Sequence, residues 1–197
     1  YDYRWKYLTR QFEGMKIYVI GFGNIGRKVA QMCLGLNMRV AAYDKYLPRE
    51  AMEQMGVEYC EGIYDGLADA DVVSIHTPLT DETKAIANAE MFDRMKHGAY
   101  FINTARADLM DEDEVVRRVN DGRFGGAVLD ANARDSGTPN PNTEACRKIV
   151  YSCHIAAMTK ESLDAVAKDC ADGIFAILAH ERWPKTANKD LFDKLGW

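Results

Sequence analysis

Short apolar runs alternate with helical patterns along most of this chain. The runs that predict β-strands are residues 16–20, 39–43, 57–59, 71–75, 99–103, 125–129 and 148–152. The patterns that predict helices are residues 48–55, 62–68, 88–95, 111–121 and 159–180, with one more directly after Gly26. Continuously apolar strands are typical of burial on both faces, and helices between them indicate parallel pairing. The sequence therefore predicts an α/β fold, a doubly wound parallel sheet of about seven strands with helices on both faces.

The first predicted strand runs directly into a glycine-rich turn, Gly21-x-Gly23-x-x-Gly26, and the second ends at Asp44. In a βαβ unit such glycines allow a tight turn, close approach of a pyrophosphate and close helix–strand packing. The free N–H groups of the following helix attract phosphate. Asp44 lies 18 residues after Gly26, where an acid binds a ribose diol and repels a 2′-phosphate. The pattern predicts a Rossmann-type site for NAD, although other ligands with a ribose diol, such as S-adenosylmethionine, also fit the motif alone.

Composition narrows the function classes. The 197 residues are 47% hydrophobic and 28% charged, enough for one domain with a real core and an appendage. A net charge of −5 argues against nucleic-acid and acidic-membrane partners. Five scattered cysteines without a CxxC pair predict reduced thiols of a cytoplasmic protein. The four histidines are too dispersed to indicate a metal site.

Ligands of such sheets bind outside the carboxyl ends of the strands, so the residues just past each strand are candidates. Two of them carry distinctive chemistry. Arg106 is suited to gripping a carboxylate with two parallel hydrogen bonds. His154 is suited to moving a proton near neutral pH. The segment 131–145, rich in Gly, Pro and Asn, predicts a structureless loop with a functional role or disorder.

Four strings resemble signatures of the D-2-hydroxyacid dehydrogenases, a family that includes phosphoglycerate, D-lactate, glycerate/glyoxylate and formate dehydrogenases. They are HTPLTDET at residues 76–83, MKHGAYFINTAR at 95–106, GRFGGAVLD at 122–130 and HIAA at 154–157. The resemblance extends over about residues 12–180. It implies hydride transfer between NAD(H) and a 2-keto or 2-hydroxy acid, without a metal. Arg106 would bind the substrate carboxylate, and His154 would protonate the carbonyl oxygen.

The resemblance and the glycine turn together assign a set of cofactor contacts. These are Gly21, Gly23, Asn24, Ile25, Gly26, Asp44, His76, Thr77, Pro78, Thr83, Thr104, Ala105, Arg106, Asp130, His154 and Ala156.

Several positions depart from the family pattern. Asp135 stands where the family has a glutamate that pairs with the histidine, 29 residues after the arginine. A carboxylate beside His154 would raise the pKa of the imidazole, so Asp135 is either that partner or a solvated loop acid. Ala107, Cys153 and Asn24 stand where the family usually has Gly, Pro and Arg, which leaves room for a divergent substrate or weakened catalysis.

The resemblance also predicts the domain organisation. Residues 1–11 resemble a linker helix from a missing substrate domain, residues 12–180 form the NAD(P)-binding domain, and residues 181–197 return toward the missing domain. Such a coenzyme domain would form a homodimer, bind NAD and turn over poorly alone. An NAD(H)-sensing corepressor that binds peptides and a formate dehydrogenase-like member stay open as alternatives. A methyltransferase is disfavoured by the later motifs.

Overall fold

The computed structural model describes residues 9–130 and 140–196 of the chain. The chain forms two compact units, Tyr1–His154 and Ile155–Trp197. Most of the linker helix expected at residues 1–11 lies outside the described residues.

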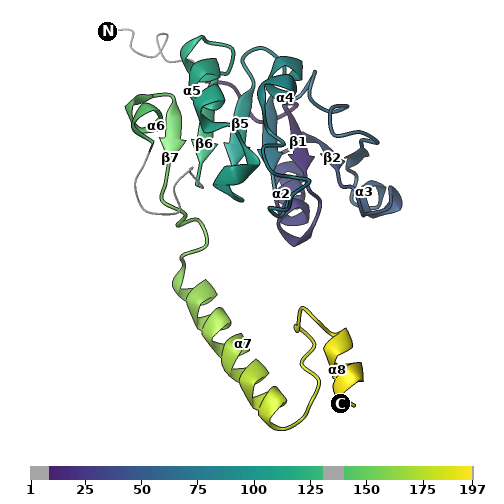
Figure 1. The fold of residues 1–197 in the computed structure, drawn as a ribbon. Coiled ribbons are helices and arrows are strands. Elements are labelled where there is room, and N and C mark those ends of the chain that lie inside the picture. Colours follow the sequence, from purple (N-terminus) through teal and green to yellow (C-terminus); the bar gives the residue numbers. More distant parts are fainter. Residues whose placement is uncertain (1–8, 131–139, 197) are drawn as a thin grey trace. The chain divides into compact units, whose positions relative to one another are not determined.

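The first unit is built on a parallel sheet of seven strands in the order β3-β2-β1-β4-β5-β6-β7 (Figure 1). Strands β2 and β3 are added on one side of β1, and strands β4 to β7 on the other side. The point between β1 and β4, where the strand order reverses, is where open α/β sheets bind ligands. The predicted fold class is confirmed. The strands are β1 (Lys16–Ile20), β2 (Arg39–Tyr43), β3 (Glu58–Tyr59), β4 (Val72–Ile75), β5 (Tyr100–Asn103), β6 (Gly126–Leu129) and β7 (Ile149–Tyr151).

Helices connect the strands, and α4 and α5 begin at residues whose side chains cap them. The Asn88 side chain accepts hydrogen bonds from two backbone N–H groups of the first turn of α4, and Asp111 caps α5 in the same way. The helices of this unit are α2 (Asn24–Gly35), α3 (Glu50–Glu53), α4 (Ala89–Arg94), α5 (Glu112–Asn120) and α6 (Pro141–Ala145), with a 3₁₀ turn, η1, at Ala107–Leu109.

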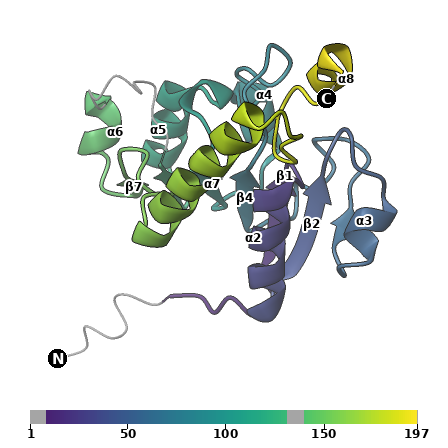
Figure 2. The ribbon, with the colours of Figure 1, turned by 90° about the horizontal axis from the view of Figure 1, so that it is seen from below.

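Two apolar cores lie on opposite faces of the sheet. Alternate residues of β1 point to different faces, so Ile17 and Val19 pack with α2 while Tyr18 and Ile20 pack with residues of α4 and α5. Figure 2 shows α2 on one side of the strands and α4 and α5 on the other. Within the first unit, α2 packs on β1 and β2, and Val128 of β6 and Val150 of β7 are 37% and 66% exposed.

A buried carboxylate closes the amino-terminal edge of the sheet. Asp71 is 5% exposed and accepts hydrogen bonds from the Lys16 backbone N–H (2.9 Å), Lys96 Nζ (2.8 Å) and Arg10 Nη1 (3.1 Å). Burial by itself raises the pKa of Asp71, but these donors outweigh burial and hold the pKa below its ordinary value of 3.8. The carboxylate therefore joins β1, β4 and the start of β5.

The helix predicted at residues 62–68 is wrong, because this segment forms consecutive turns. A Cβ on Gly66 would lie 2.4 Å from the Tyr18 ring, so the backbone passes directly against that side chain. The Tyr18 hydroxyl donates to the carbonyl oxygen of Ile63 at 2.9 Å. Close packing on Tyr18 and the low helix propensity of two glycines, at positions 62 and 66, explain the difference.

The structureless loop predicted at residues 131–145 is also partly wrong. Residues 131–139 lie outside the described part, but Pro141–Ala145 is helical and is capped by Asn140. The helix rests on α5, since the buried Thr143 hydroxyl donates to the buried Glu112 carboxylate. An Asn-Pro pair is a helix-start signal, with proline at the first helical position.

The second unit contains α7 (Lys160–Leu178) and α8 (Asp190–Leu195). The long helix predicted at 159–180 is confirmed, with Thr159 as its N-cap. Within the unit, a Cβ on Gly173 of α7 would lie 3.2 Å from Nε1 of Trp183, and Arg182 pairs with Asp193 of α8 at 2.6 Å.

Across residues 9–130 and 140–196, the helices are all too short or too polar to cross a membrane.

Candidate functional site

The strand register brings the predicted ligand-binding residues to one edge of the sheet. One row of paired residues crosses six strands and consists of Tyr43, Ile20, Ile75, Asn103, Leu129 and Tyr151. Each strand in this row ends at the same level. The residues that follow them along the carboxyl edge are Asp44, Gly21, His76, Thr104, Asp130 and Ser152.

The three glycines of the turn differ in what a side chain at each position would contact. Gly21 has φ +93°, and a Cβ there would lie 2.8 Å from the backbone of His76 and Thr77. A Cβ on Gly26 would lie 2.0 Å from the Gly21 carbonyl oxygen. A Cβ on Gly23, in contrast, would meet no atom within 4 Å. The described fold does not need a glycine at position 23, so the open space beside it is available to a ligand.

The amino terminus of α2 is open to an anion. Gly23 is its N-cap and supplies no side-chain cap, and the first turn carries no acidic residue. Its backbone N–H groups and the positive end of the helix dipole therefore point toward the space beside the glycine turn. This arrangement fits a pyrophosphate.

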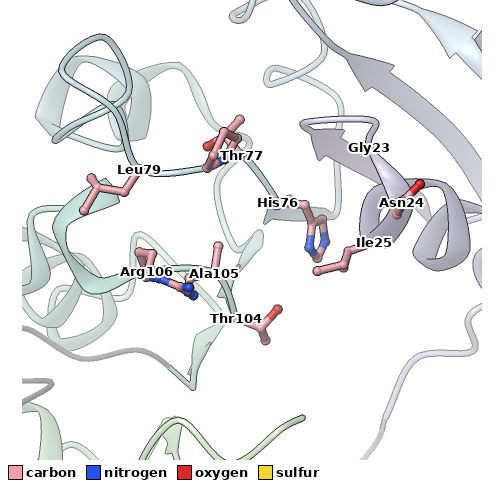
Figure 3. A pocket seen from close by; sticks show the side chains of 10 residues that line it. Gly23, Asn24, Ile25, His76, Thr77, Leu79, Thr104, Ala105 and Arg106 are labelled. Carbon is pink, nitrogen blue, oxygen red and sulfur yellow. The ribbon is translucent and has the colours of Figure 1, made fainter. Parts of the chain in front are cut away.

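A pocket of about 510 Å³ lies between α2 and the loops that follow β4 and β5. Figure 3 shows side chains from these three places around the same space. The lining residues are Gly23, Asn24, Ile25, His76, Thr77, Pro78, Leu79, Thr104, Ala105 and Arg106. The Thr77 hydroxyl is buried and has no hydrogen-bond partner within the described chain, and a bound polar ligand would satisfy it.

His76 contributes no charge to this pocket. Burial lowers the pKa of His76 to about 4, so the imidazole is neutral at pH 7. Its Nε2 lies 2.8 Å from the hydroxyl of the buried Ser74. The ring therefore forms a neutral wall between the glycine turn and the loop after β5.

Arg106 is held in place by a buried asparagine. The Asn103 side chain is fully buried, donates to the Arg106 carbonyl oxygen at 2.8 Å and accepts from the Ala105 N–H at 3.0 Å. The Arg106 guanidinium is exposed and donates to the Ala105 carbonyl oxygen at 2.7 Å. Most of its donors remain available to an anionic group in the pocket.

A second pocket of about 420 Å³ continues from the first toward the end of β2. There the Asp44 carboxylate accepts hydrogen bonds from the N–H groups of Phe22 (2.8 Å), Tyr46 (2.9 Å) and Leu47 (3.1 Å). These bonds fix the orientation of the carboxylate. A carboxylate has about four lone-pair positions, so a place remains for a ribose hydroxyl.

The two pockets unite most of the predicted contacts. Gly21, Asp44 and Thr83 line the second pocket, and Gly23, His76, Thr77 and Pro78 line both. Gly26, Asp130, His154 and Ala156 are not among the residues that line them. Asp135 lies outside the described residues.

The four predicted cofactor contacts that do not line the pockets lie in different surroundings. Gly26 lies where α2 approaches the Gly21 backbone. Asp130 is buried and accepts a hydrogen bond from the Ser152 hydroxyl at 2.6 Å. His154 is exposed, with φ +57°, at the end of the first unit, and Ala156 belongs to the second unit. Within the described ranges, no three His, Cys, Asp or Glu side chains are grouped to hold a metal ion.

Some lining residues were not predicted from the sequence. They are Leu79 in the first pocket and Tyr46, Ile63, Thr80, Glu82 and Ile86 in the second. The loop that begins at the end of β4 continues through Leu79, Thr80 and Glu82. These residues would have been predicted if more positions after each strand had been considered. Ile63 lies four residues after β3 and would have been included in the same way, whereas Ile86 lies far from any strand end in the sequence.

A parallel sheet with a glycine turn and an open helix start at its switch point defines a dinucleotide-binding domain. Residues 2–156 match the family model described as D-isomer specific 2-hydroxyacid dehydrogenase, NAD binding domain. The chain therefore belongs to this family and corresponds to its NAD-binding domain, and NAD is its cofactor.

The relatives agree with this assignment. D-3-phosphoglycerate dehydrogenase 2 of Arabidopsis thaliana is 33% identical over 90% of this chain and 28% of its own length. Glyoxylate reductase of Aeropyrum pernix is 28% identical over 92% of this chain and 54% of its own length. An NAD-complexed D-isomer specific 2-hydroxyacid dehydrogenase of Lactobacillus delbrueckii ssp. bulgaricus superimposes with a TM-score of 0.83 at 27% identity, covering 92% of this chain and 58% of that one. The chain thus spans only part of the length of the relatives it matches.

Proposed function

We propose that this chain is the coenzyme domain of an enzyme that transfers hydride between NAD(H) and a 2-hydroxy or 2-keto acid. One observation carries the proposal. The exposed guanidinium of Arg106 and the open start of α2 line the same pocket of about 510 Å³. A site for a dinucleotide phosphate thereby adjoins a site for a substrate carboxylate.

The residues of the two pockets have distinct roles in cofactor binding. The backbone of Gly23, Asn24 and Ile25 binds the pyrophosphate at the start of α2. The Asp44 carboxylate accepts a hydrogen bond from the adenosine ribose. Thr77 offers to the cofactor the hydroxyl that has no hydrogen-bond partner among the described residues. Bound NAD(H) supplies the hydride that is exchanged with the substrate carbon.

The substrate is held and protonated by the chain's own side chains. Arg106 binds the carboxylate and polarises the adjacent carbonyl, and Asn103 keeps Arg106 in position through its main chain. His154 donates the proton to the carbonyl oxygen during reduction, and Asp135 is proposed as its partner. Charge stabilisation and orientation are then the contributions of this domain.

The proposal extends to organisation. Residues 1–11 link this domain to a substrate domain, residues 12–180 bind the cofactor and residues 181–197 return to the substrate domain. Exposed apolar side chains such as Val150 of β7 and Phe175 of α7 support association as a homodimer. Five free cysteines support a cytoplasmic location.

The first test is a fluorescence titration of this chain with NADH and with NADPH, compared with Asp44→Ala. We expect saturable NADH binding, much weaker NADPH binding, and a loss of both NADH affinity and discrimination in the variant. Asp81→Ala is the control, because Asp81 is an exposed acid of the neighbouring loop that does not line either pocket. Unchanged affinities in Asp44→Ala would show that Asp44 does not bind the ribose.

A second test uses the intact enzyme and a panel of 2-keto acids with NADH. The proposed dehydrogenase function is supported if the wild-type enzyme turns over a 2-keto acid and His154→Ala abolishes this turnover while the affinity for the cofactor is retained. NADH binding without turnover on any 2-keto acid would favour the NAD(H)-sensing alternative instead.

A further inference from the structure

An ion pair lies at the adenosine end of the second pocket. Lys45 Nζ donates to Glu82 Oε2 at 2.6 Å, and both residues line the pocket that contains Asp44. Lys45 directly follows Asp44 at the end of β2, whereas Glu82 comes from the loop after β4. The pair therefore connects two loops through residues that are 37 positions apart in the sequence.

A rigid turn presents Glu82 to Lys45. The Thr83 hydroxyl accepts a hydrogen bond from the Thr80 N–H at 2.8 Å and donates to the Pro78 carbonyl oxygen at 2.7 Å. These bonds fix the backbone on both sides of Glu82. Lys45 Nζ also lies 5.7 Å from the centre of the Tyr46 ring, a second contact that holds the ammonium group at this place.

Among the described residues that line this pocket, Lys45 is the one cation. The hydrogen bond with Glu82 raises the pKa of Lys45 and lowers that of Glu82, so both groups are charged at neutral pH. His76, the other basic residue of the lining, is neutral there. A 2′-phosphate on the ribose would therefore depend on Lys45 for any compensating charge, and Glu82 already uses that charge.

We propose that Glu82 is a specificity-determining residue, which pairs with Lys45 and so withholds the cation from a 2′-phosphate. This inference rests on the proposed placement of the ribose at Asp44. Glu82 and Asp44 then act together, because each adds a negative charge near the 2′ position and Lys45 cancels only one of them. NADPH is disfavoured by both acids, whereas NADH, which has no 2′-phosphate, is affected by Glu82 only weakly.

The expected effect is modest. The side chains of Lys45 and Glu82 are 53% and 63% exposed, and exposed ion pairs are weak and screened by salt. Glu82→Gln should lower the Kd for NADPH by about fivefold at low ionic strength and leave the Kd for NADH within about twofold. The gain should shrink as salt is added, since it is electrostatic.

The experiment titrates the chain with NADH and NADPH in four forms: wild type, Glu82→Gln, Lys45→Met and the double variant. The gain for NADPH in Glu82→Gln should disappear in the double variant, because Lys45 is the group that is released. Glu90→Gln is the matched control. It breaks the Glu90–Arg94 pair, whose side chains are 59% and 52% exposed, on α4 outside both pockets.

The outcomes separate the two proposals. If NADH does not bind the wild-type chain, the proposed cofactor site fails. If NADH binds all forms and NADPH affinity does not rise in Glu82→Gln, the role of Glu82 is refuted while the site stands. An equal gain in the double variant would also refute it, because the effect would then not pass through Lys45.

Discussion

Replacing Gly23 with alanine should separate the contribution of the glycine turn to the fold from its contribution to cofactor binding. At Gly23 a Cβ meets no atom within 4 Å, and φ −71° with ψ −159° is extended backbone that alanine adopts without strain. Alanine is a poorer N-cap than glycine, by about 0.5 kcal/mol or somewhat more. It also restricts the unfolded chain, which stabilises by about 0.4–1 kcal/mol. The free energy of unfolding should therefore change by less than about 1 kcal/mol, or about 4 °C in Tm.

Cofactor binding should respond much more strongly to the same change. The added methyl group fills the open space beside the start of α2 and keeps a pyrophosphate from its backbone N–H groups. Losing one or two charge-assisted hydrogen bonds of about 1.5 kcal/mol each raises the Kd for NADH by about tenfold to more than a hundredfold. Gly26→Ala is the contrasting variant, because its Cβ would lie 2.0 Å from the Gly21 carbonyl oxygen. That overlap should cost about 3 kcal/mol or more of stability.

The assay combines urea denaturation with NADH fluorescence titration on the same three proteins. Gly23→Ala should keep the wild-type unfolding midpoint and lose affinity, whereas Gly26→Ala should lose stability first. A Gly23→Ala protein that binds NADH as tightly as the wild type would refute the reasoning, because the pyrophosphate would then not approach the backbone at this glycine.

Two further predictions concern buried polar side chains. Asp71→Asn should destabilise the fold by about 2–4 kcal/mol at pH 7, since it removes a buried charge that is paired with Lys96. Burial raises the pKa of Asp71, but its donors, Lys96 and the Lys16 N–H among them, lower it below 3.8. The stabilisation is therefore present above about pH 4 and is lost as the pH falls through the folded value, so urea denaturation should show a smaller difference between the two proteins in acid. Asn103→Ala should lower kcat/KM of the intact enzyme by about tenfold or more with little change in the Kd for NADH, because it releases Arg106. Asn103→Asp keeps the acceptor for the Ala105 N–H but loses the donor to the Arg106 carbonyl oxygen, so it should lose at least as much activity, and wild-type activity in Asn103→Asp would contradict the positioning role.

Local sequence patterns determined most of the first unit. Each predicted strand is present, because continuous apolar runs bounded by helix caps favour one kind of element wherever they occur. The turn from Gly21 to Gly26 was also predictable. Gly21 and Gly26 meet the steric demands of a βαβ unit, Gly23 leaves space for a ligand, and the position of Asp44 follows from the length of that unit.

The sequence predictions are wrong where residues distant in the sequence decide the local structure. Residues 62–68 carry a helical pattern, but Gly66 packs against the Tyr18 ring and the Tyr18 hydroxyl bonds to a carbonyl oxygen that a helix would use. Short helix α6 depends on a buried contact between Thr143 and Glu112, 31 positions apart. Tertiary packing overrides propensity in the first case and supports a marginal helix in the second.

The sequence by itself determined the order of the elements, the glycine turn and the identity of the residues past each strand end. Tertiary structure alone decided which of those residues share a pocket, because strand register places Gly21, Asp44, His76 and Thr104 side by side. It also decided the pairing of Lys45 with Glu82. Charge attraction acts through space and leaves no periodic trace along the chain, so such a pair becomes visible only when the loops that carry it have been folded together.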